Sequence, residues 1–484
     1  MSERIAIVGS GFLGMTLALR LSEQGHEVTV YEAASEIGGS ASAWQIGDTV
    51  WDKHYHVTLA SDSHARKLIA DLGLEKEFRW AETKTGLYSD GKLVSMSGSM
   101  DLVRFPGLDL LSKLRLGLTI FYASRVKDSK KLEKVGVEKW LARLSGNKAF
   151  EKIWQPLLKA KLGDAYKDSS AAFVWATIQR MRGARNSGMK KEMFGYVRGG
   201  YARVLERFAE VLEEKDVEVR LNSPIETVEK LTGGKFRVVT AAARRRGDTK
   251  PVALHQKAKY SYMKVAAGIA RGFSGGFVTE PQPDVSRVVE FRPKEETFDK
   301  VILTCPSNVA ARVAPQLKHH ERQAMRNVAF QGVVCASVLA RCSLSPFLVT
   351  NITHDAPFTS VIEMSALVDK REFDGNALIY LPKYVAPDDE LFDRSDEEIR
   401  ESFLTELEKM YPQFKRADVV DFKVSRVRQV FPVPVLNYSD GLAPVRTSLD
   451  GMYVLNSSHI VNGTLSVNET VDRAEQFVRE NWPR

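Results

Sequence analysis

The 484-residue sequence predicts an α/β fold in which a Rossmann-like domain is interleaved in sequence with a second, α+β domain. The chain opens with a short apolar segment, Ile5 to Val8, which is followed at once by a glycine turn and a helical pattern. Alternating, aromatic-rich segments typical of a second sheet occur at Leu348 to Asp369 and at Ala377 to Tyr384. The chain is also long enough, with 44% apolar residues, to build two or three domains.

The first segment predicts a buried parallel strand that enters a helix through Gly9, Gly11 and Gly14, which have GxGxxG spacing. Gly9 permits the tight turn, Gly11 lets the backbone approach a pyrophosphate, and Gly14 lets the helix pack closely on the strand. The second strand ends at Glu32, about twenty residues on, where a carboxylate can bind an adenosine ribose. The acid favours a free 2′-hydroxyl, and therefore FAD or NAD over NADP. Two further cofactor contacts are predicted within the turn, Phe12 and Leu13.

A glycine pair, Gly38 and Gly39, follows Glu32 by six residues and precedes Ser40. This order resembles the long fingerprint of FAD-binding proteins of the glutathione-reductase structural class. Within that class the chain resembles the flavin amine-oxidase superfamily, which includes amine oxidases, protoporphyrinogen oxidases and phytoene desaturases, with UDP-galactopyranose mutases as structural relatives. The resemblance implies FAD, with the glycine pair and Ser40 close to the flavin side of the pyrophosphate. Non-covalent binding is expected, because no cysteine or histidine is recognised at the family's covalent attachment position.

The resemblance also implies how the chain is divided. A Rossmann-like FAD-binding domain of the glutathione-reductase type is expected from 1–60, 195–320 and 440–484, and a substrate domain from 61–194 and 321–439. Ile225 occupies the position whose backbone meets the adenine ring in the family. A basic insertion, about 241–295, includes Arg244, Arg245 and Arg246, and we expect it to be a solvated loop, with an anionic partner as the alternative.

The last forty residues resemble the end of the family's cofactor domain. A strand is expected at Met452 to Leu455, a turn at Gly463 and Thr464, and then a closing helix. The resemblance implies that the positive end of that helix faces the flavin, with cofactor contacts from Ser457, Val467 and Asn468. The chain departs from the family at three places, the first being Ser40, which follows the glycine pair where many members have an arginine. Asn456 and Ser457 replace a glycine and an acid, and Val334 and Cys335 occupy the place of the amine-oxidase lysine, which puts oxidation of monoamines or polyamines in doubt.

Catalytic candidates are sparse. The order His54, Tyr55, His56 is similar to a motif by which mutase-like members set a histidine against the flavin, and His56 is the candidate; both histidines could equally be surface residues or hydrogen-bonded core residues. Glu363 and Lys383 are expected in the substrate pocket, unless they pair with each other or point to solvent. A metal site is not predicted, because no third ligand follows at an informative spacing.

Two helical segments carry further expectations. Val135 to Tyr166 is amphipathic, with predicted breaks at Gly146 and near Pro156; its Trp140 and Trp154 suit a core better than substrate stacking, and Lys161 also matches the family pattern. The apolar run Leu114 to Val126 is too short to span a bilayer and is flanked by lysines. We interpret it as a core helix, with an interfacial membrane helix as the alternative, so peripheral membrane contact stays open.

The expected function is that of an FAD-dependent oxidoreductase that removes a hydride from a carbon or nitrogen centre of an unidentified small-molecule substrate. The alternatives are a mutase-like flavoenzyme acting on a nucleotide sugar without net redox change, and a catalytically silent FAD-binding scaffold. The net charge of +8 comes with no nucleic-acid-binding signature. Three cysteines without CxxC spacing and no recognisable signal peptide predict a cytoplasmic protein. The sequence does not predict an oligomeric state.

Overall fold

The computed structural model describes residues 2–97, 101, 105, 107–186, 193–241, 243–246, 288–291, 293–461 and 465–483. Most of the predicted basic insertion lies outside these residues, as do Gly463 and Thr464 of the predicted turn. Arg244, Arg245 and Arg246 are described, and they do not form the expected loop: they belong to β13 (Ala243–Arg246), which pairs antiparallel with β14 (Val288–Phe291).

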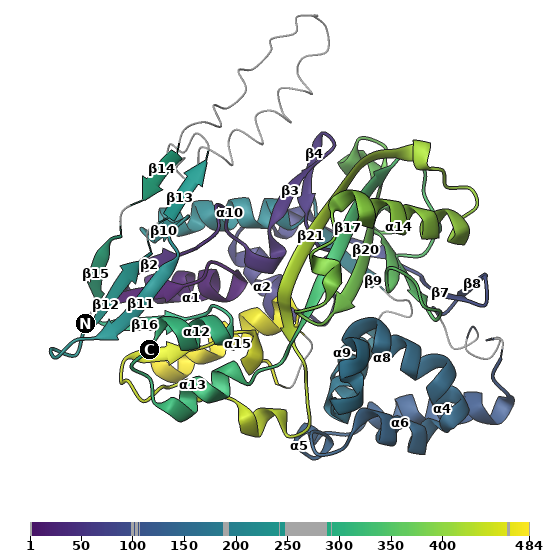
Figure 1. The fold of residues 1–484 in the computed structure, drawn as a ribbon, viewed down its shortest axis with the longest axis horizontal. Helices are drawn as coiled ribbons and strands as arrows, with labels where there is room; N and C mark the ends of the chain where they lie inside the picture. Colours follow the sequence, from purple (N-terminus) through teal and green to yellow (C-terminus); the bar gives the residue numbers. More distant parts are fainter. Residues whose placement is uncertain are drawn as a thin grey trace, which may run out of the picture.

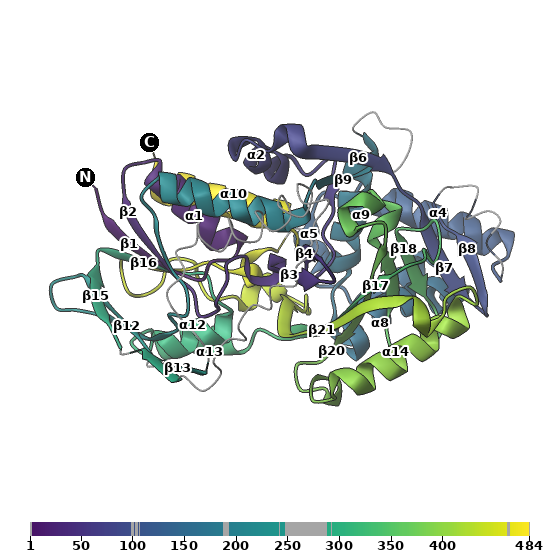
Figure 2. The ribbon, with the colours of Figure 1, turned by 90° about the horizontal axis from the view of Figure 1, so that it is seen from above.

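Within the described residues, one parallel sheet has the strand order β10-β2-β1-β16-β22. Its strands are β1 (Arg4–Val8), β2 (Glu27–Tyr31), β10 (Glu218–Arg220), β16 (Lys300–Leu303) and β22 (Met452–Val454). Ile5 and Ile7 face a helical layer of α1 (Phe12–Ser22), α10 (Gly200–Glu214) and α15 (Val467–Asn481). Ala6 and Val8 face the antiparallel layer β11 (Ile225–Lys230), β12 (Phe236–Thr240) and β15 (Glu295–Phe298) (Figure 2). Burial on both faces explains why this strand is apolar throughout rather than alternating.

A second, mixed sheet has the order β21-β17-β20-β19-β18-β7-β8 within the described part of the chain. Its strands are β7 (Thr85–Ser89), β8 (Lys92–Ser95), β17 (Phe330–Ala340), β18 (Val349–Ile352), β19 (Ser360–Glu363), β20 (Ala377–Val385) and β21 (Val419–Pro432). This confirms the strands expected near 348–369 and 377–384. Every residue of β17 is buried, because α14 (Asp396–Met410) packs on one face and a core around Trp51 on the other.

A helical layer lies beside the mixed sheet, far from both chain termini (Figure 1). It contains α4 (Leu110–Ala123), α5 (Ser129–Leu132), α6 (Val137–Ser145), α8 (Gln155–Leu162) and α9 (Ala171–Asn186). The break predicted at Gly146 is confirmed, since Gly146 has a φ of +85°. The break predicted near Pro156 takes the form of a change in helix type: a π-helical segment (Phe150–Trp154) ends immediately before α8, whose second residue is Pro156.

The interpretation of Leu114 to Val126 as a core helix is also wrong. This run falls mostly within α4, where only Leu116, Thr119 and Ala123 are buried. Trp140, in contrast, is a core residue as expected, at 3% exposure.

The remaining elements connect these layers. They include the hairpin β3 (Ala43–Ile46) and β4 (Thr49–Asp52), the small sheet β5-β9-β6, and three helices. The small sheet uses β5 (Thr58–Leu59), β6 (Phe78–Glu82) and β9 (Met193–Val197), and the helices are α2 (Ser63–Asp71), α12 (Ser307–Val313) and α13 (His319–Arg326). Because the chain leaves the parallel sheet after β2 and returns to it for β10, β16 and β22, both sheets are assembled from distant parts of the sequence.

Candidate functional site

A single cavity of about 1150 Å³ extends from the glycine turns of the parallel sheet to the helical layer. At one end it is lined by the residues that follow β1 and β2. Its middle is lined by His54 to Val57 and by side chains of β17 and β20, and its far end by α8 and α9. Most sequence-predicted cofactor residues lie in this lining: Gly9, Gly11, Phe12, Leu13, Glu32, Gly38, Gly39, Ser40, Ile225, Ser457, Val467 and Asn468.

The three glycines of the first turn have different surroundings. Gly9 has a φ of +115°, which side chains rarely adopt. A Cβ on Gly14 would lie 2.0 Å from the carbonyl oxygen of Gly9, so Gly14 is needed for contact between helix and turn. A Cβ on Gly11 would meet no protein atom within 4 Å, although this residue borders the cavity. The space beside Gly11 is therefore open to a ligand rather than filled by the protein.

The second glycine turn is attached to the first. The N–H of Gly38 donates to the carbonyl of Ser10 at 2.9 Å, and Gly38 forms a parallel bridge with Gly11. Gly38 has a φ of +104°, and a Cβ there would lie 2.6 Å from Leu205 Cδ1. Gly39 also has a positive φ, of +56°. The two turns thus form one continuous wall of exposed backbone at this end of the cavity.

Glu32 stands at the end of β2 and holds the neighbouring loops through its carboxylate. The carboxylate accepts hydrogen bonds from the backbone N–H and hydroxyl of Ser10, both at 2.9 Å, and from the N–H of Ala34 at 2.8 Å. Ile225, which is 8% exposed, lines the cavity beyond it.

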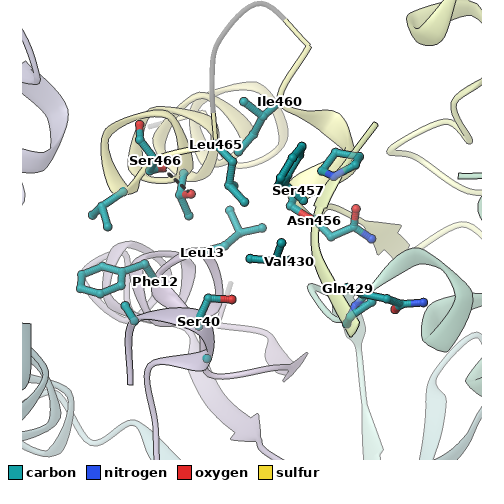
Figure 3. A pocket seen from close by; sticks show the side chains of 18 of the residues that line it. Phe12, Leu13, Ser40, Gln429, Val430, Asn456, Ser457, Ile460, Leu465 and Ser466 are labelled. Carbon is teal, nitrogen blue, oxygen red and sulfur yellow. Dashed lines mark hydrogen bonds between the residues drawn. The ribbon is translucent and has the colours of Figure 1, made fainter. Parts of the chain in front are cut away.

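The first turn of α15 borders the cavity, opposite Phe12 and Leu13 of α1 (Figure 3). Ser466 caps this helix by accepting from Glu469 N, so the N–H groups of Val467 and Asn468 have no partner within the helix. The side chain of Asn468 is engaged elsewhere, because its Oδ1 accepts from the N–H groups of His64 and Ala65 at 2.9 and 3.2 Å. It thereby caps α2, a role that the sequence did not suggest.

Asn456, which replaces the family's glycine, has a structural role at the end of β22. Its Oδ1 accepts from the N–H and hydroxyl of Ser458, and its Nδ2 donates to the carbonyl of Cys305 at 2.9 Å. The side chain therefore joins the ends of β22 and β16. Ser457 itself lines the cavity (Figure 3).

The two histidines of the predicted motif both line the cavity but differ in their partners. His54 is fixed between the carbonyl of Ser40, at 3.2 Å, and the hydroxyl of Ser425, at 3.1 Å. Burial lowers the pKa of His54 to about 4, so its imidazole is neutral. The ring of His56 packs on Tyr201, and its Nδ1 lies 3.6 Å from the buried Asp52 carboxylate. Burial raises the pKa of Asp52.

The other two catalytic candidates lie outside the described lining of the cavity, contrary to the expectation that they would be in the pocket. Glu363 is 1% exposed, and its carboxylate accepts from the N–H groups of Leu344 and Ser345. Lys383 donates to the carbonyl of Ala356 at 2.6 Å. Neighbouring residues of a strand point to opposite faces, and here Pro382 and Tyr384 face the cavity while Lys383 faces away.

A polar cluster that sequence reasoning did not assemble lies in the middle of the cavity. Lys161 Nζ donates to the hydroxyl of Tyr384 at 2.7 Å and lies 3.9 Å from the centre of its ring. The hydroxyls of Tyr384 and Tyr55 are 3.1 Å apart. The alternation of β20 could have indicated Tyr384, because neighbouring strand residues point to opposite faces and Lys383, the predicted candidate, points away from the cavity. Burial raises the pKa of the Tyr384 hydroxyl well above its ordinary value, so it remains protonated.

Beyond this cluster the cavity becomes apolar. Trp154, expected in the core, is only partly buried and belongs to this lining. The apolar lining comprises Trp154, Leu157, Leu158, Ala172, Phe173, Val174, Ile178, Val430 and Phe431.

In the residues that the structure describes, no group of three or more His, Cys, Asp or Glu side chains is arranged to hold a metal ion. None of the described helices has the length and apolar character needed to cross a bilayer.

Comparison with known proteins shows the family to which the chain belongs. The family model described as flavin-containing amine oxidoreductase matches residues 14–254 and 278–465. Zeta-carotene desaturase of Synechocystis sp. is 25% identical over 49% of this chain and 52% of its own length. Protoporphyrinogen oxidase 2 of Arabidopsis thaliana is 28% identical over 28% of each chain. The matched region therefore spans about half, or less, of the length of these curated relatives.

Several solved structures share the whole fold. A protein of Exiguobacterium sp. described as a protoporphyrinogen oxidase aligns with a TM-score of 0.70 at 16% identity, covering 99% of this chain and 98% of its own. Reduced UDP-galactopyranose mutase aligns with a TM-score of 0.70 at 12% identity, covering 99% and 95%. At these identities the likeness shows the α/β fold alone. The family model, in contrast, matches most of the sequence, and the chain therefore belongs to the flavin-containing amine oxidoreductases.

Proposed function

We propose that this protein is an FAD-dependent oxidoreductase that holds FAD non-covalently and takes a hydride from a carbon or nitrogen centre of a small, mainly apolar substrate. The observation that carries this proposal is the continuity of the cavity. One end is lined by glycine backbone and helix N–H groups, and the other by apolar side chains, so a cofactor and a substrate can meet inside it.

The residues at the first end fit FAD. The open space beside Gly11 suits a pyrophosphate, and the N–H groups of Val467 and Asn468, which have no partner within the helix, suit a flavin that becomes negatively charged on reduction. Arg312 and Arg473 add positive charge to the lining. A bound flavin supplies the hydride acceptor. This cofactor end is proposed to belong to the domain formed by 1–60, 195–320 and 440–484, and the substrate end to that formed by 61–194 and 321–439.

Non-covalent attachment is supported by the state of the cavity's thiols. Cys305 and Cys335 both line the cavity, and burial raises the pKa of each to about 12. Such thiols stay protonated at neutral pH, and a protonated thiol is a poor nucleophile toward a flavin.

At the substrate end, Lys161 and Tyr384 form a bonded polar pair beside the apolar side chains of α8 and α9, and Thr177 and Arg180 of α9 also line the cavity. We propose that the Tyr384 hydroxyl, oriented by Lys161, donates a hydrogen bond to the single polar group of the substrate. That bond would orient the apolar part of the substrate between α8 and α9. His56 is retained as a candidate at the flavin side of the substrate, where the carboxylate of Asp52 would orient its ring.

A mutase-like reaction on a nucleotide sugar is the second candidate, and the presence of His56 in the cavity favours it. The apolar side chains that α8 and α9 contribute to the lining argue against it, because a nucleotide sugar carries a diphosphate and many hydroxyls that would be left without partners beside them. Arg180, which α9 also contributes, already pairs with Asp62. A silent FAD-binding scaffold would hold flavin that no substrate reduces.

The experiment begins with the absorbance spectrum of the purified protein. We expect a yellow protein whose FAD is released into the supernatant by acid precipitation; flavin that stays with the pellet would contradict non-covalent binding. The protein is then reduced anaerobically with dithionite and re-exposed to air. Rapid reoxidation indicates an oxidase, and a persistent reduced form indicates a dehydrogenase or the mutase. A protein that binds no FAD would overturn the proposal.

The role of Lys161 is tested with Lys161→Met, which keeps the length of the side chain but removes the bond to Tyr384. For substrates found by anaerobic flavin reduction, we expect the rate of reduction to fall about tenfold or more, because one oriented hydrogen bond is lost, while FAD affinity stays the same. Lys159→Met is the matched control, since Lys159 lies exposed on the same helix. Equal reduction rates for both variants would exclude this role.

A further inference from the structure

The outer face of α4 carries a concentration of apolar side chains that is unusual for a protein surface. Ten large apolar residues are exposed in the described part of the chain, and seven of them lie on α4. Leu110 is 78% exposed, Leu111 66% and Leu114 59%. Single exposed apolar residues are common, but a continuous patch of them marks an interaction surface.

These side chains form one stripe along the helix. At 3.6 residues per turn, Leu110, Leu111, Leu114, Leu118, Phe121 and Tyr122 fall within an arc of about 120°. The residues that α4 buries against the rest of the protein, Leu116, Thr119 and Ala123, lie on the opposite side. The helix is therefore apolar on both faces, and its inner face alone accounts for its attachment to the fold.

The position of α4 leaves this stripe accessible. Figures 1 and 2 both place α4 at the end of the molecule that is farthest from the two termini. Its 14 residues span about 21 Å, which is shorter than the hydrocarbon core of a bilayer. A helix of this length and pattern can lie along a membrane surface but cannot cross it.

The charge around the stripe is strongly positive. Between residues 107 and 148 the sequence has ten Lys or Arg and four Asp or Glu. Arg125 and Lys127, just beyond the end of α4, are exposed, and the guanidinium of Arg125 lies 4.1 Å from the centre of the Phe121 ring. Cations thus border the apolar stripe.

We propose that α4 docks this protein on a bilayer containing anionic phospholipids, with the stripe from Leu110 to Tyr122 inserted among the headgroups and the neighbouring cations on the lipid phosphates. A second copy of the chain fits this surface less well. Contact between two copies through the same helix is isologous, so it would bring together two copies of a segment that carries an excess of positive charge. An anionic membrane satisfies both the apolar stripe and its border.

The test is cosedimentation of the full chain with vesicles, and it does not depend on the proposed redox activity. Vesicles of equal parts phosphatidylcholine and phosphatidylglycerol are compared with vesicles of phosphatidylcholine alone. We expect binding to the anionic vesicles to be at least about tenfold stronger, and to weaken with added salt. A protein that stays in the supernatant with both kinds of vesicle would overturn the proposal.

Variants locate the contact. Leu114→Glu combined with Leu118→Glu is expected to weaken anionic-vesicle binding at least about tenfold, and Lys127→Glu about fivefold. All three side chains are exposed, so the circular dichroism spectrum and melting temperature stay unchanged. Val420→Glu, at another exposed apolar residue on β21, is the matched control and binds as the unaltered protein does. Undiminished binding by the double variant would refute the assignment, and so would a dimer in vesicle-free solution that the double variant dissociates.

Discussion

Two glycines in the first turn have opposite surroundings, and substitution should separate their roles. A side chain on Gly11 would extend into the cavity, whereas one on Gly14 would collide with the backbone of Gly9. We expect Gly11→Val to leave the free energy of unfolding of the apoprotein within about 1 kcal/mol of its original value but to weaken FAD binding about tenfold or more. Gly14→Ala is expected to lower that free energy by about 3 kcal/mol or more.

Urea unfolding of the apoprotein and fluorescence titration with FAD measure the two effects separately. Apoprotein is required because bound FAD would itself stabilise the fold. Gly25→Ala is unsuitable as a control, since Gly25 has a φ of +83°. Gly117→Ala on α4 meets no neighbouring atom; it should leave FAD affinity unchanged and raise the free energy of unfolding by up to about 1 kcal/mol, because alanine is the better helix former. Normal FAD affinity in Gly11→Val would show that the pyrophosphate lies elsewhere.

His459 is a residue whose burial should appear in the pH dependence of stability. Its Nδ1 accepts from the N–H of Asn456 and its Nε2 donates to the carbonyl of Ala443, both at 3.2 Å. Burial lowers the pKa of His459 to about 4, from an ordinary value of 6.5. As the pH falls below 6.5, the unfolded chain takes up a proton that the folded chain refuses, so the free energy of unfolding decreases until about pH 4.

The loss attributable to His459 has a maximum slope of about 1.4 kcal/mol per pH unit. Urea unfolding between pH 7.5 and 4 measures it as the difference between the unaltered protein and His459→Gln, in which this part of the slope disappears. Contributions from other titrating groups are common to both proteins and cancel. His320→Gln, at an exposed histidine, should keep the original slope. If the free energy of unfolding changes equally with pH in His459→Gln and in the unaltered protein, His459 takes up its proton equally readily in the folded and the unfolded chain.

At the scale of elements, the side chain of Asn468 joins α15 to α2 and also borders the cavity. Asn468→Ala removes the acceptor for the N–H groups of His64 and Ala65, and should lower the free energy of unfolding by about 1–2 kcal/mol. Asn468→Asp keeps an acceptor but adds a negative charge near the proposed flavin. Because that charge opposes the charge of reduced flavin, the midpoint potential should become about 20 mV or more lower.

Redox titration with a reference dye and urea unfolding distinguish these outcomes. Asn327→Asp, at the end of α13 and outside the cavity lining, supplies the same charge change at a distance. An unchanged potential in Asn468→Asp would indicate that the flavin does not lie against α15.

The glycine turns could be predicted from the sequence, whereas the face of β20 that borders the cavity could not. The glycine turns were predictable because Gly9 and Gly38 need backbone angles that few other residues adopt, which is a purely local requirement. The choice of Lys383 over Tyr384 failed because alternation shows that the two point apart but not which face of β20 borders the cavity. That depends on α14 and the Trp51 core, which come from distant parts of the chain.

The prediction that the apolar run Leu114 to Val126 forms a core helix failed for a related reason. Its composition predicted burial, and burial requires a partner layer that no local pattern specifies. In the structure the partners, α6, α7 (Asn147–Ala149) and α9, cover one side of the helix only. The folded arrangement was therefore needed to distinguish a core helix from a surface helix.

At the scale of the whole molecule, the cavity connects layers that are separate in the fold. Its lining includes Gly11 beside the parallel sheet, Cys335 on the mixed sheet and Leu158 in the helical layer. The chain also passes repeatedly between the two sheets, since β7 and β8 come between β2 and β10, and β17 to β21 between β16 and β22. If either sheet unfolds, the chain segments that lead into the other sheet are no longer held in place.

This connectivity predicts that the protein unfolds as one unit and that FAD stabilises all of it. We expect the loss of helical circular dichroism and the rise of free-flavin fluorescence to share one melting temperature, which increases with added FAD because the ligand binds only the folded state. FAD at about 100 times its dissociation constant should add about 2.7 kcal/mol to the free energy of unfolding. The part of the near-ultraviolet circular dichroism signal that Trp140→Phe removes adds a probe of the helical layer, where Trp140 is buried. If this signal melts at a temperature that FAD does not change, the helical layer unfolds independently, and a cofactor at the parallel sheet does not stabilise the substrate end of the cavity.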